Sequence, residues 1–130
     1  MIVFRLDPKA GVAPYMQIAQ QVKNALRLGM LKVGDQLPTV KEVVGSLAIN
    51  PNTVLKAYRE LEREGYLQGR PGLGTFVLKG IDGPPPGARL ALRRSLQRWL
   101  KSASDAGLDH EDVAALFETT VRDSIEEEIA

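Results

Sequence analysis

The sequence predicts a mainly α-helical fold with one small β-hairpin, and three observations in residues 14–79 carry this prediction. Three stretches place apolar residues at helical spacing and are separated by short turns. Two of these stretches open with strong helix-capping signals. Two strand-like runs around a glycine-rich turn follow the last of them.

The first predicted helix begins at Pro14, because proline suits a first-turn position where its missing N–H is no loss. Apolar residues follow at helical spacing: Tyr15, Ile18, Val22, Ala25 and Leu26. Gly29 is the expected stop. Residues 34–38 then cross to the next helix, with a short strand as one option.

The second predicted helix starts at Thr39, which forms the capping-box pattern T-x-x-E with Glu42. Its inward stripe consists of Val40, Val43, Val44 and Leu47. Ala48 and Ile49 make a short turn, and we expect Ile49 to enter the core.

The third predicted helix has a paired start signal, with Asn50 as N-cap and Pro51 in the first helical position. Its inward stripe is Val54, Ala57, Tyr58 and Leu61, and Gly65 ends it. At about 100° per residue, the opposite face carries Asn52, Lys56, Arg59 and Arg63. One helix therefore has a buried stripe and a basic stripe on opposite sides.

A glycine-rich hairpin follows, with strands at residues 66–70 and 74–78. Two helices, a tight turn and a hairpin in this order predict a winged helix-turn-helix domain over residues 1–79. The Gly/Pro-rich segment 80–87 is the predicted linker, because three consecutive prolines favour a stiff extended chain. Residues 88–130 form the predicted two-helix tail.

The tail has apolar stripes that two short helices cannot enclose by themselves. They consist of Leu92, Leu96, Trp99, Leu100, Leu116, Phe117 and Val121. We predict that a second copy of the chain buries them in a two-fold dimer. The alternative is that the tail folds back on the first domain.

Composition and charge limit the classes of function that the chain can have. The 130 residues are 44% hydrophobic and contain no cysteine, which excludes disulfides and thiolate sites. Neither a signal peptide nor a membrane span is predicted, and we expect a cytoplasmic protein. Residues 1–79 hold 11 Lys/Arg against 6 Asp/Glu, whereas residues 80–130 hold 6 against 10. A basic first part is the part expected to meet a polyanion.

The predicted helix pair is shaped to read DNA, because a major groove about 12 Å wide admits one α-helix. Asn50 and Asn52 offer amides for adenine, and Lys56 can reach guanine or a phosphate. Arg59 and Arg63 lie better for phosphates, as does Lys41. The hairpin is the wing of this domain. Its Arg70 supplies a positive charge, while Gly72 and Gly74 let the backbone approach DNA closely.

Enzyme chemistry has little support in the sequence. His110 is the single histidine and lies at a helix start beside Glu111 and Asp112. No nucleophile, base and orienting group can be assembled around it. The Gly72-x-Gly74 pair lies in a hairpin, which does not fit a nucleotide-binding loop. We predict no enzymatic activity, no metal and no cofactor.

Residues 38–77, PTVKEVVGSLAINPNTVLKAYRELEREGYLQGRPGLGTFV, resemble the winged helix-turn-helix of the GntR family of bacterial transcription regulators. The resemblance covers roughly residues 5–79, and the short tail is similar to that of the YtrA-type subfamily, where it is a dimerisation element. The resemblance implies DNA contacts from the start of helix two, the start of helix three and the wing: Lys41, Asn50, Pro51, Asn52, Thr53, Leu55, Lys56, Arg70, Pro71 and Gly72.

Many relatives have arginine at the positions of Lys41, Pro51 and Leu55, so their base code does not transfer directly. Lys56 and Arg59 are expected to take over the charge. We therefore expect a homodimeric, sequence-specific regulator of double-stranded DNA, with repression as the expected mode and an inverted-repeat operator. A small-molecule effector remains open, and the alternative function is a winged-helix protein-interaction module without DNA binding.

Overall fold

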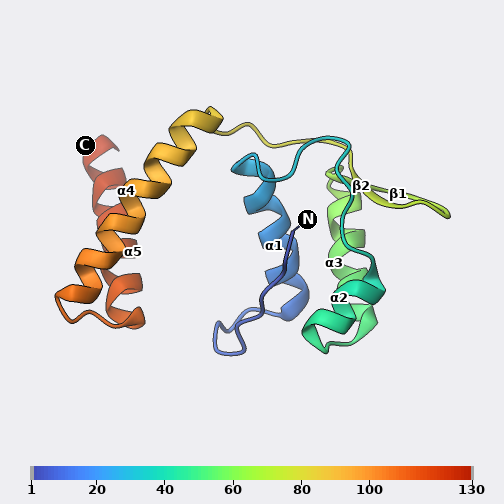
Figure 1. The fold of residues 1–130 in the computed structure, drawn as a ribbon, viewed down its shortest axis with the longest axis horizontal. Coiled ribbons are helices and arrows are strands. Elements are labelled where there is room, and N and C mark those ends of the chain that lie inside the picture. The colour runs from blue at the N-terminus through green and yellow to red at the C-terminus, as the bar shows by residue number, and fades with distance from the viewer. Residues whose placement is uncertain (1, 130) are drawn as a thin grey trace. The chain divides into compact units, whose positions relative to one another are not determined.

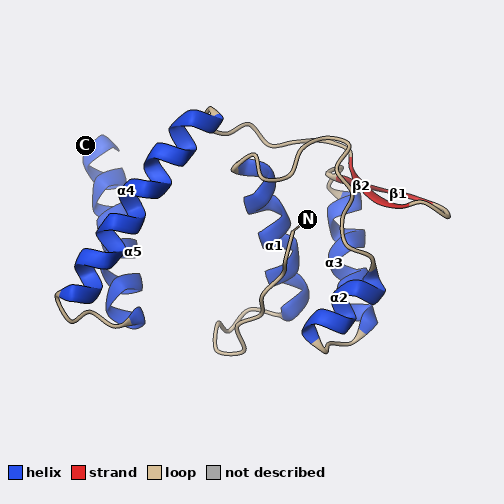
Figure 2. Cartoon of the chain, viewed as in Figure 1, coloured by secondary structure: helices blue, strands red, loops and turns tan. Residues whose placement is uncertain are grey.

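The computed structural model describes residues 2–129, and the chain forms two compact units, Met1–Pro86 and Gly87–Ala130 (Figure 1). The fold is mainly helical with one hairpin, as predicted (Figure 2). The elements in chain order are α1 (Pro14–Arg27), α2 (Val40–Leu47), α3 (Pro51–Arg63), β1 (Leu67–Arg70), β2 (Gly74–Val77), α4 (Pro86–Asp105) and α5 (His110–Ile129).

The hairpin is antiparallel, and its register pairs Leu67 with Val77 and Arg70 with Gly74. The crossing segment before α2 lies along the outer edge of β2. Leu37 donates its backbone N–H to the Thr75 carbonyl at 2.8 Å, and Gln36 forms an isolated bridge with Phe76. The segment forms an isolated bridge and not the short strand that was one option there, and it ties the wing to the start of α2.

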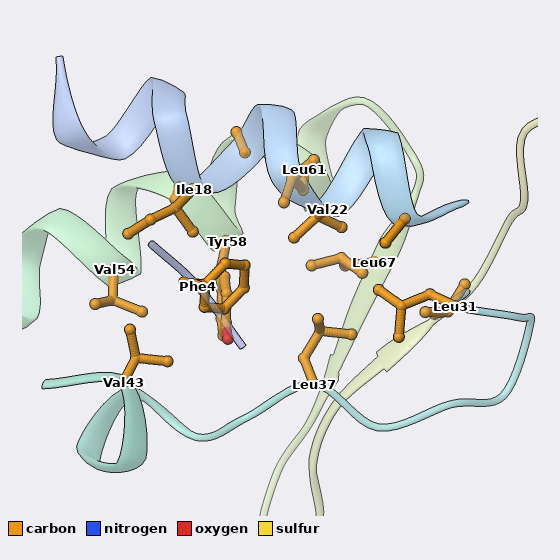
Figure 3. Close-up of a cluster of buried hydrophobic side chains, with 14 of the residues drawn as sticks. Phe4, Ile18, Val22, Leu31, Leu37, Val43, Val54, Tyr58, Leu61 and Leu67 are labelled. Atoms are coloured by element: carbon orange, nitrogen blue, oxygen red, sulfur yellow. The ribbon is translucent and has the colours of Figure 1, made fainter. Parts of the chain in front are cut away.

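One apolar core closes the first unit. The largest of its fully buried side chains are Ile18, Leu37, Leu61, Leu67, Val22 and Val54. Figure 3 shows the cluster, to which α1, α2, α3, the hairpin and the N-terminal residue Phe4 all contribute. The inward stripe predicted for α3 is buried, as is that of α1 except for Tyr15, which is half-buried, whereas Val43 is the buried member of the α2 stripe. Ile49 packs partly buried against this core, as predicted.

The helix ends follow the capping signals. The Glu42 N–H donates to Thr39 Oγ1 at 3.1 Å, and the Glu42 carboxylate accepts from the Thr39 backbone, so the capping box is present. At the end of α3, Gly65 has φ 88°, and the Tyr66 N–H donates to the Leu61 carbonyl at 2.9 Å. This is a Schellman motif, in which glycine is favoured because the φ is positive.

Two glutamines of α1 hold the extended N-terminal segment by its backbone. Gln21 accepts from the Arg5 N–H at 3.0 Å and donates to the Arg5 carbonyl. Gln17 accepts from the Asp7 N–H at 2.8 Å and donates to the Asp7 carbonyl at 2.9 Å. These hydrogen bonds hold the segment that carries Phe4 against α1, and Phe4 packs in the core. This burial of Phe4 was not predicted from the sequence.

The start of the linker belongs to the first unit. Ile81 packs against the core, and Gly83 lies so close to α1 that a Cβ there would fall 1.9 Å from the Arg27 carbonyl oxygen. Helix α4 begins at Pro86, two residues before the predicted Ala88. Proline at the first helical position explains this early start, because its φ already matches a helix.

The second unit consists of two helices that leave their apolar stripes open. The Asp112 N–H donates to Asp109 Oδ1 at 2.8 Å, so Asp109 caps α5. Among the apolar residues described in this unit, only Ala103 is buried. The exposed large apolar residues are Leu90, Leu92, Leu96, Leu100, Leu116, Phe117, Val121 and Ile125. No helix among the described residues is long and apolar enough to span a bilayer.

Candidate nucleic-acid interface

The first turns of α3 form an exposed, mostly polar surface. Pro51 and Asn52 are exposed, while Thr53 and Leu55 are half-buried on its two flanks. The buried stripe of α3 holds this surface outward, because Val54, Ala57, Tyr58 and Leu61 occupy the opposite side. The structure therefore presents the predicted reading residues on one face of one helix.

Asn50 has a structural role that limits it as a base contact. Its Oδ1 accepts the Asn52 backbone N–H at 2.8 Å and caps α3. Recognition of adenine by an asparagine uses both the amide oxygen and the amide nitrogen. The cap engages the oxygen, so Asn52 is the better placed of the two amides.

The basic stripe of α3 is smaller than the sequence suggested. Arg63 forms a double hydrogen bond with Glu60, one arm of which is 3.2 Å, so its charge is paired. The same contact holds the pKa of the Glu60 carboxyl below its ordinary value. Arg59 is exposed and has no hydrogen bond or ion pair within the described part of the chain. Lys56 places its Nζ 4.1 Å from the centroid of the Tyr15 ring.

The start of α2 is fixed to α3 by one buried hydrogen bond. The Tyr58 hydroxyl donates to the Pro38 carbonyl at 2.7 Å. Burial first, and the nearby Glu42 carboxylate second, raise the pKa of the Tyr58 phenol well above its ordinary value. The phenol therefore stays protonated and keeps donating. Lys41 is exposed in the first turn of the helix that this bond orients.

The wing lies next to the same end of α2. Thr39, the N-cap of α2, lines one shallow groove together with wing residues 69–75. Gln36 donates from its amide to the Leu73 carbonyl at 3.2 Å, which braces the hairpin tip. Arg70 is exposed, with its guanidinium 4.8 Å from the centroid of the Phe76 ring. Gly72 is exposed with φ 75°, as its place in the turn requires.

Lys41, the wing and the α3 reading face (Asn52, Thr53, Leu55 and Lys56) thus lie on elements that pack in sequence, α2 against α3 and α3 against β1 of the hairpin. Sequence reasoning missed Tyr15 and Gln36 as supports of this surface. Helical spacing places Tyr15 in the inward stripe of α1, and no local pattern indicates an aromatic ring that faces a lysine 41 positions later. Among the described residues, no cluster of His, Asp or Glu could hold a metal ion.

These features define the class: two helices joined by a tight turn and flanked by a β-hairpin make a winged helix-turn-helix protein. The family model described as "Bacterial regulatory proteins, gntR family" matches residues 14–77. The chain is also 36% identical over 110 residues to the HTH-type transcriptional repressor YtrA of Bacillus subtilis (strain 168), covering 84% of this chain and 85% of that protein. The chain therefore belongs to the GntR family.

Solved structures agree with this placement. YtrA from Sulfolobus acidocaldarius, described as a GntR-family transcription factor, is 30% identical with a TM-score of 0.56, over 77% of this chain and 99% of that one. A structure described as a transcriptional antiterminator from Listeria monocytogenes EGD-e is 28% identical with a TM-score of 0.59, over 94% of this chain and 92% of that one. Both likenesses extend beyond the residues that the family model matches.

Proposed function

We propose that the chain is a sequence-specific regulator of transcription that binds double-stranded DNA as a homodimer and represses from an inverted-repeat operator. The observation that carries the proposal is the exposed surface at the start of α3, on a helix that the Tyr58–Pro38 hydrogen bond ties to the start of α2. A bacterial relative named as a transcriptional repressor supports repression as the mode. The proposal places the protein in the cytoplasm, with DNA, and assigns it no enzymatic activity.

In this proposal, the α3 surface enters the major groove. Asn52 reads a base through its free amide, and Thr53 and Leu55 contact base edges or a thymine methyl. The basic side chains around this surface contact the phosphates of the DNA backbone. They are Lys41, Lys56, Arg59 and Arg70. Gly72 lets the wing turn approach the backbone or the minor groove closely.

The second unit supplies the dimer contact in this proposal. A groove of about 490 Å³ on α4 and α5 is lined mostly by apolar side chains, among them Leu96, Trp99, Phe117 and Val121. An exposed apolar surface of this kind on a two-helix unit needs a partner. A second copy related by a two-fold axis buries the same surface on both chains, and it pairs two reading helices for two half-sites.

A gel-shift titration against the promoter upstream of the chain's own gene tests the proposal at several salt concentrations. We expect a specific complex whose affinity falls with salt, because released counterions drive the phosphate contacts. Asn52→Ala should weaken operator binding by about 1–3 kcal/mol and relax the sequence preference at one position. Thr119→Ala, an exposed change in α5, is the control and should leave binding unchanged.

A wild-type chain without sequence preference or salt dependence would contradict the DNA proposal. Triple substitution of Asn52, Lys56 and Arg59 by alanine then separates the alternative. Loss of a protein partner from this variant, with no change on DNA, would assign the α3 face to protein recognition.

A further inference from the structure

We infer that Tyr15 is a positioning residue that holds Lys56 at the α1 margin of the reading face and thereby assigns it to the DNA backbone. This inference rests on the proposed function, since it specifies how one contact of that site is made. It answers a question that the sequence leaves open, which is whether Lys56 reads a base or contacts a phosphate.

The first support is the geometry of the contact. The Lys56 Nζ lies 4.1 Å from the Tyr15 ring centroid, within the distance at which the negative face of the ring attracts a cation. It is shorter than the contacts of Lys79 and Lys23 with Tyr66, at 4.8 and 5.9 Å. Because Tyr15 lies in the first turn of α1, the ammonium group is held towards α1.

The second support is the fixed position of the ring. Tyr15 is half-buried and packs against the core of the first unit. Its helix, α1, packs on the buried stripe of α3. Both ends of the contact are therefore attached to rigid elements, and the exposed lysine has a defined place before DNA arrives.

The third support is the charge around Lys56. Glu60 lies one turn further along α3, at the i+4 spacing that often forms a helix ion pair. Glu60 is instead bonded to Arg63, and Lys56 has no ion pair within the described residues. The ring does not neutralise the ammonium group, so Lys56 keeps its full charge and its N–H donors for a phosphate.

Together these contacts have an energetic consequence. A free lysine loses side-chain entropy when it is fixed on DNA, and a lysine already held on a ring loses less. The benefit does not depend on base sequence, because phosphates are present on every duplex. Loss of Tyr15 should therefore weaken all DNA binding and leave the base preference unchanged.

The test measures the full chain by fluorescence anisotropy on the operator and on a scrambled duplex of the same length. Tyr15→Phe keeps the ring face, and its dissociation constant should stay within about twofold of wild type. Tyr15→Leu removes the ring, and binding to both duplexes should weaken by about threefold. Lys56→Met should weaken both by about tenfold and reduce the salt slope by about 1, while Tyr15→Leu keeps the slope.

The double variant separates positioning from a general structural effect. Tyr15→Leu in the Lys56→Met background should cost nothing more, because the ring then has no lysine to hold. Multiplied losses, a loss confined to the operator, or equal losses for the Phe and Leu variants would each overturn the inference. Lys79→Met is the matched control for removal of a ring-bound lysine, and its loss should be smaller than that of Lys56→Met.

A second measurement needs neither DNA nor the leucine variant. In the NMR spectrum of the wild-type chain, the methylene protons beside the Lys56 ammonium should resonate upfield of their ordinary position, because the Nζ next to them lies over the ring. Ordinary shifts there would overturn the inference. Failure of the wild-type chain to bind either duplex would instead overturn the proposed function, and the NMR result would still decide the contact.

Discussion

The two units of this chain use the same local signals and reach different outcomes. Both contain capped helices with apolar stripes, and a glycine with positive φ follows α1, α3 and α4. In the first unit the stripes of three helices meet a hairpin and close a core. In the second unit most residues of the α4 and α5 stripes stay exposed, and Trp99 is half-buried. Periodicity therefore predicts which face is apolar, whereas the number of neighbouring elements decides whether the chain itself can cover it.

A leucine-to-alanine substitution in each unit tests this difference, because its cost in unfolding free energy depends on how far the leucine is buried. Leu61→Ala removes a side chain with 0% exposure, and the first unit should lose about 2–5 kcal/mol of unfolding free energy. Leu90→Ala removes a leucine that is 46% exposed, so its cost should stay below about 1 kcal/mol. Denaturant unfolding of both full-length variants measures the two costs, and equal costs would refute the distinction.

The open face of the second unit should be the part that makes the dimer. Phe117→Asp places a charge in the α4–α5 groove, and we expect it to shift sedimentation from dimer to monomer. Operator affinity should then fall by about 30-fold, since a buried aromatic anchor is worth about 2 kcal/mol. The melting temperature of the first unit should not change.

Thr119→Asp is the control for that charge, because Thr119 is exposed and lies outside the residues that line the groove. It should remain a dimer with wild-type operator affinity. If both variants stay dimeric, the dimer contact lies elsewhere.

The joint between the units can be tested at Gly83. A Cβ at this position meets the Arg27 carbonyl, so Gly83→Ala should release the linker from α1 and cost about 1 kcal/mol or more. Amide hydrogen exchange at residues 80–83 should become faster. Gly80→Ala is the matched control, because a Cβ there meets nothing within 4 Å, and it should leave the exchange rates unchanged.

The smallest predicted effect concerns the turn between α2 and α3. Ala48 has φ 53°, a left-handed conformation that disfavours every residue with a Cβ. Ala48→Gly should raise the unfolding free energy of the first unit by about 0.5–1 kcal/mol. Ser46→Gly, two residues earlier within α2, should lower it by a similar amount. Thermal melting of both variants measures whether each substitution stabilises or destabilises the first unit. A lower stability of Ala48→Gly would contradict this account.

Most elements of the first unit could be predicted because their signals are local. The capping box of Thr39, the Asn50–Pro51 helix start and the Gly65 stop depend on residues within one turn, and the structure confirms each. Contacts between segments that are far apart in the sequence have no local sequence signal. The insertion of Phe4 and the docking of Gly83 on α1 depend on segments that are distant in sequence.

In the candidate site, too, the local features could be predicted from the sequence and the contacts between side chains could not. Exposure of Asn52, Lys56 and Arg59 followed from helical periodicity, and the structure agrees. What each side chain contacts could not be predicted. Arg63 is paired with Glu60, and Lys56 lies on Tyr15, because rotamers and neighbouring helices decide these contacts.

Selection of bound sequences from a random double-stranded DNA pool tests the central claim most directly, with the mass of the selected complex measured afterwards. The account predicts an enriched inverted repeat bound by two chains, and loss of that complex in Phe117→Asp. Enrichment of a single half-site bound by one chain, or no enrichment at all, would contradict it.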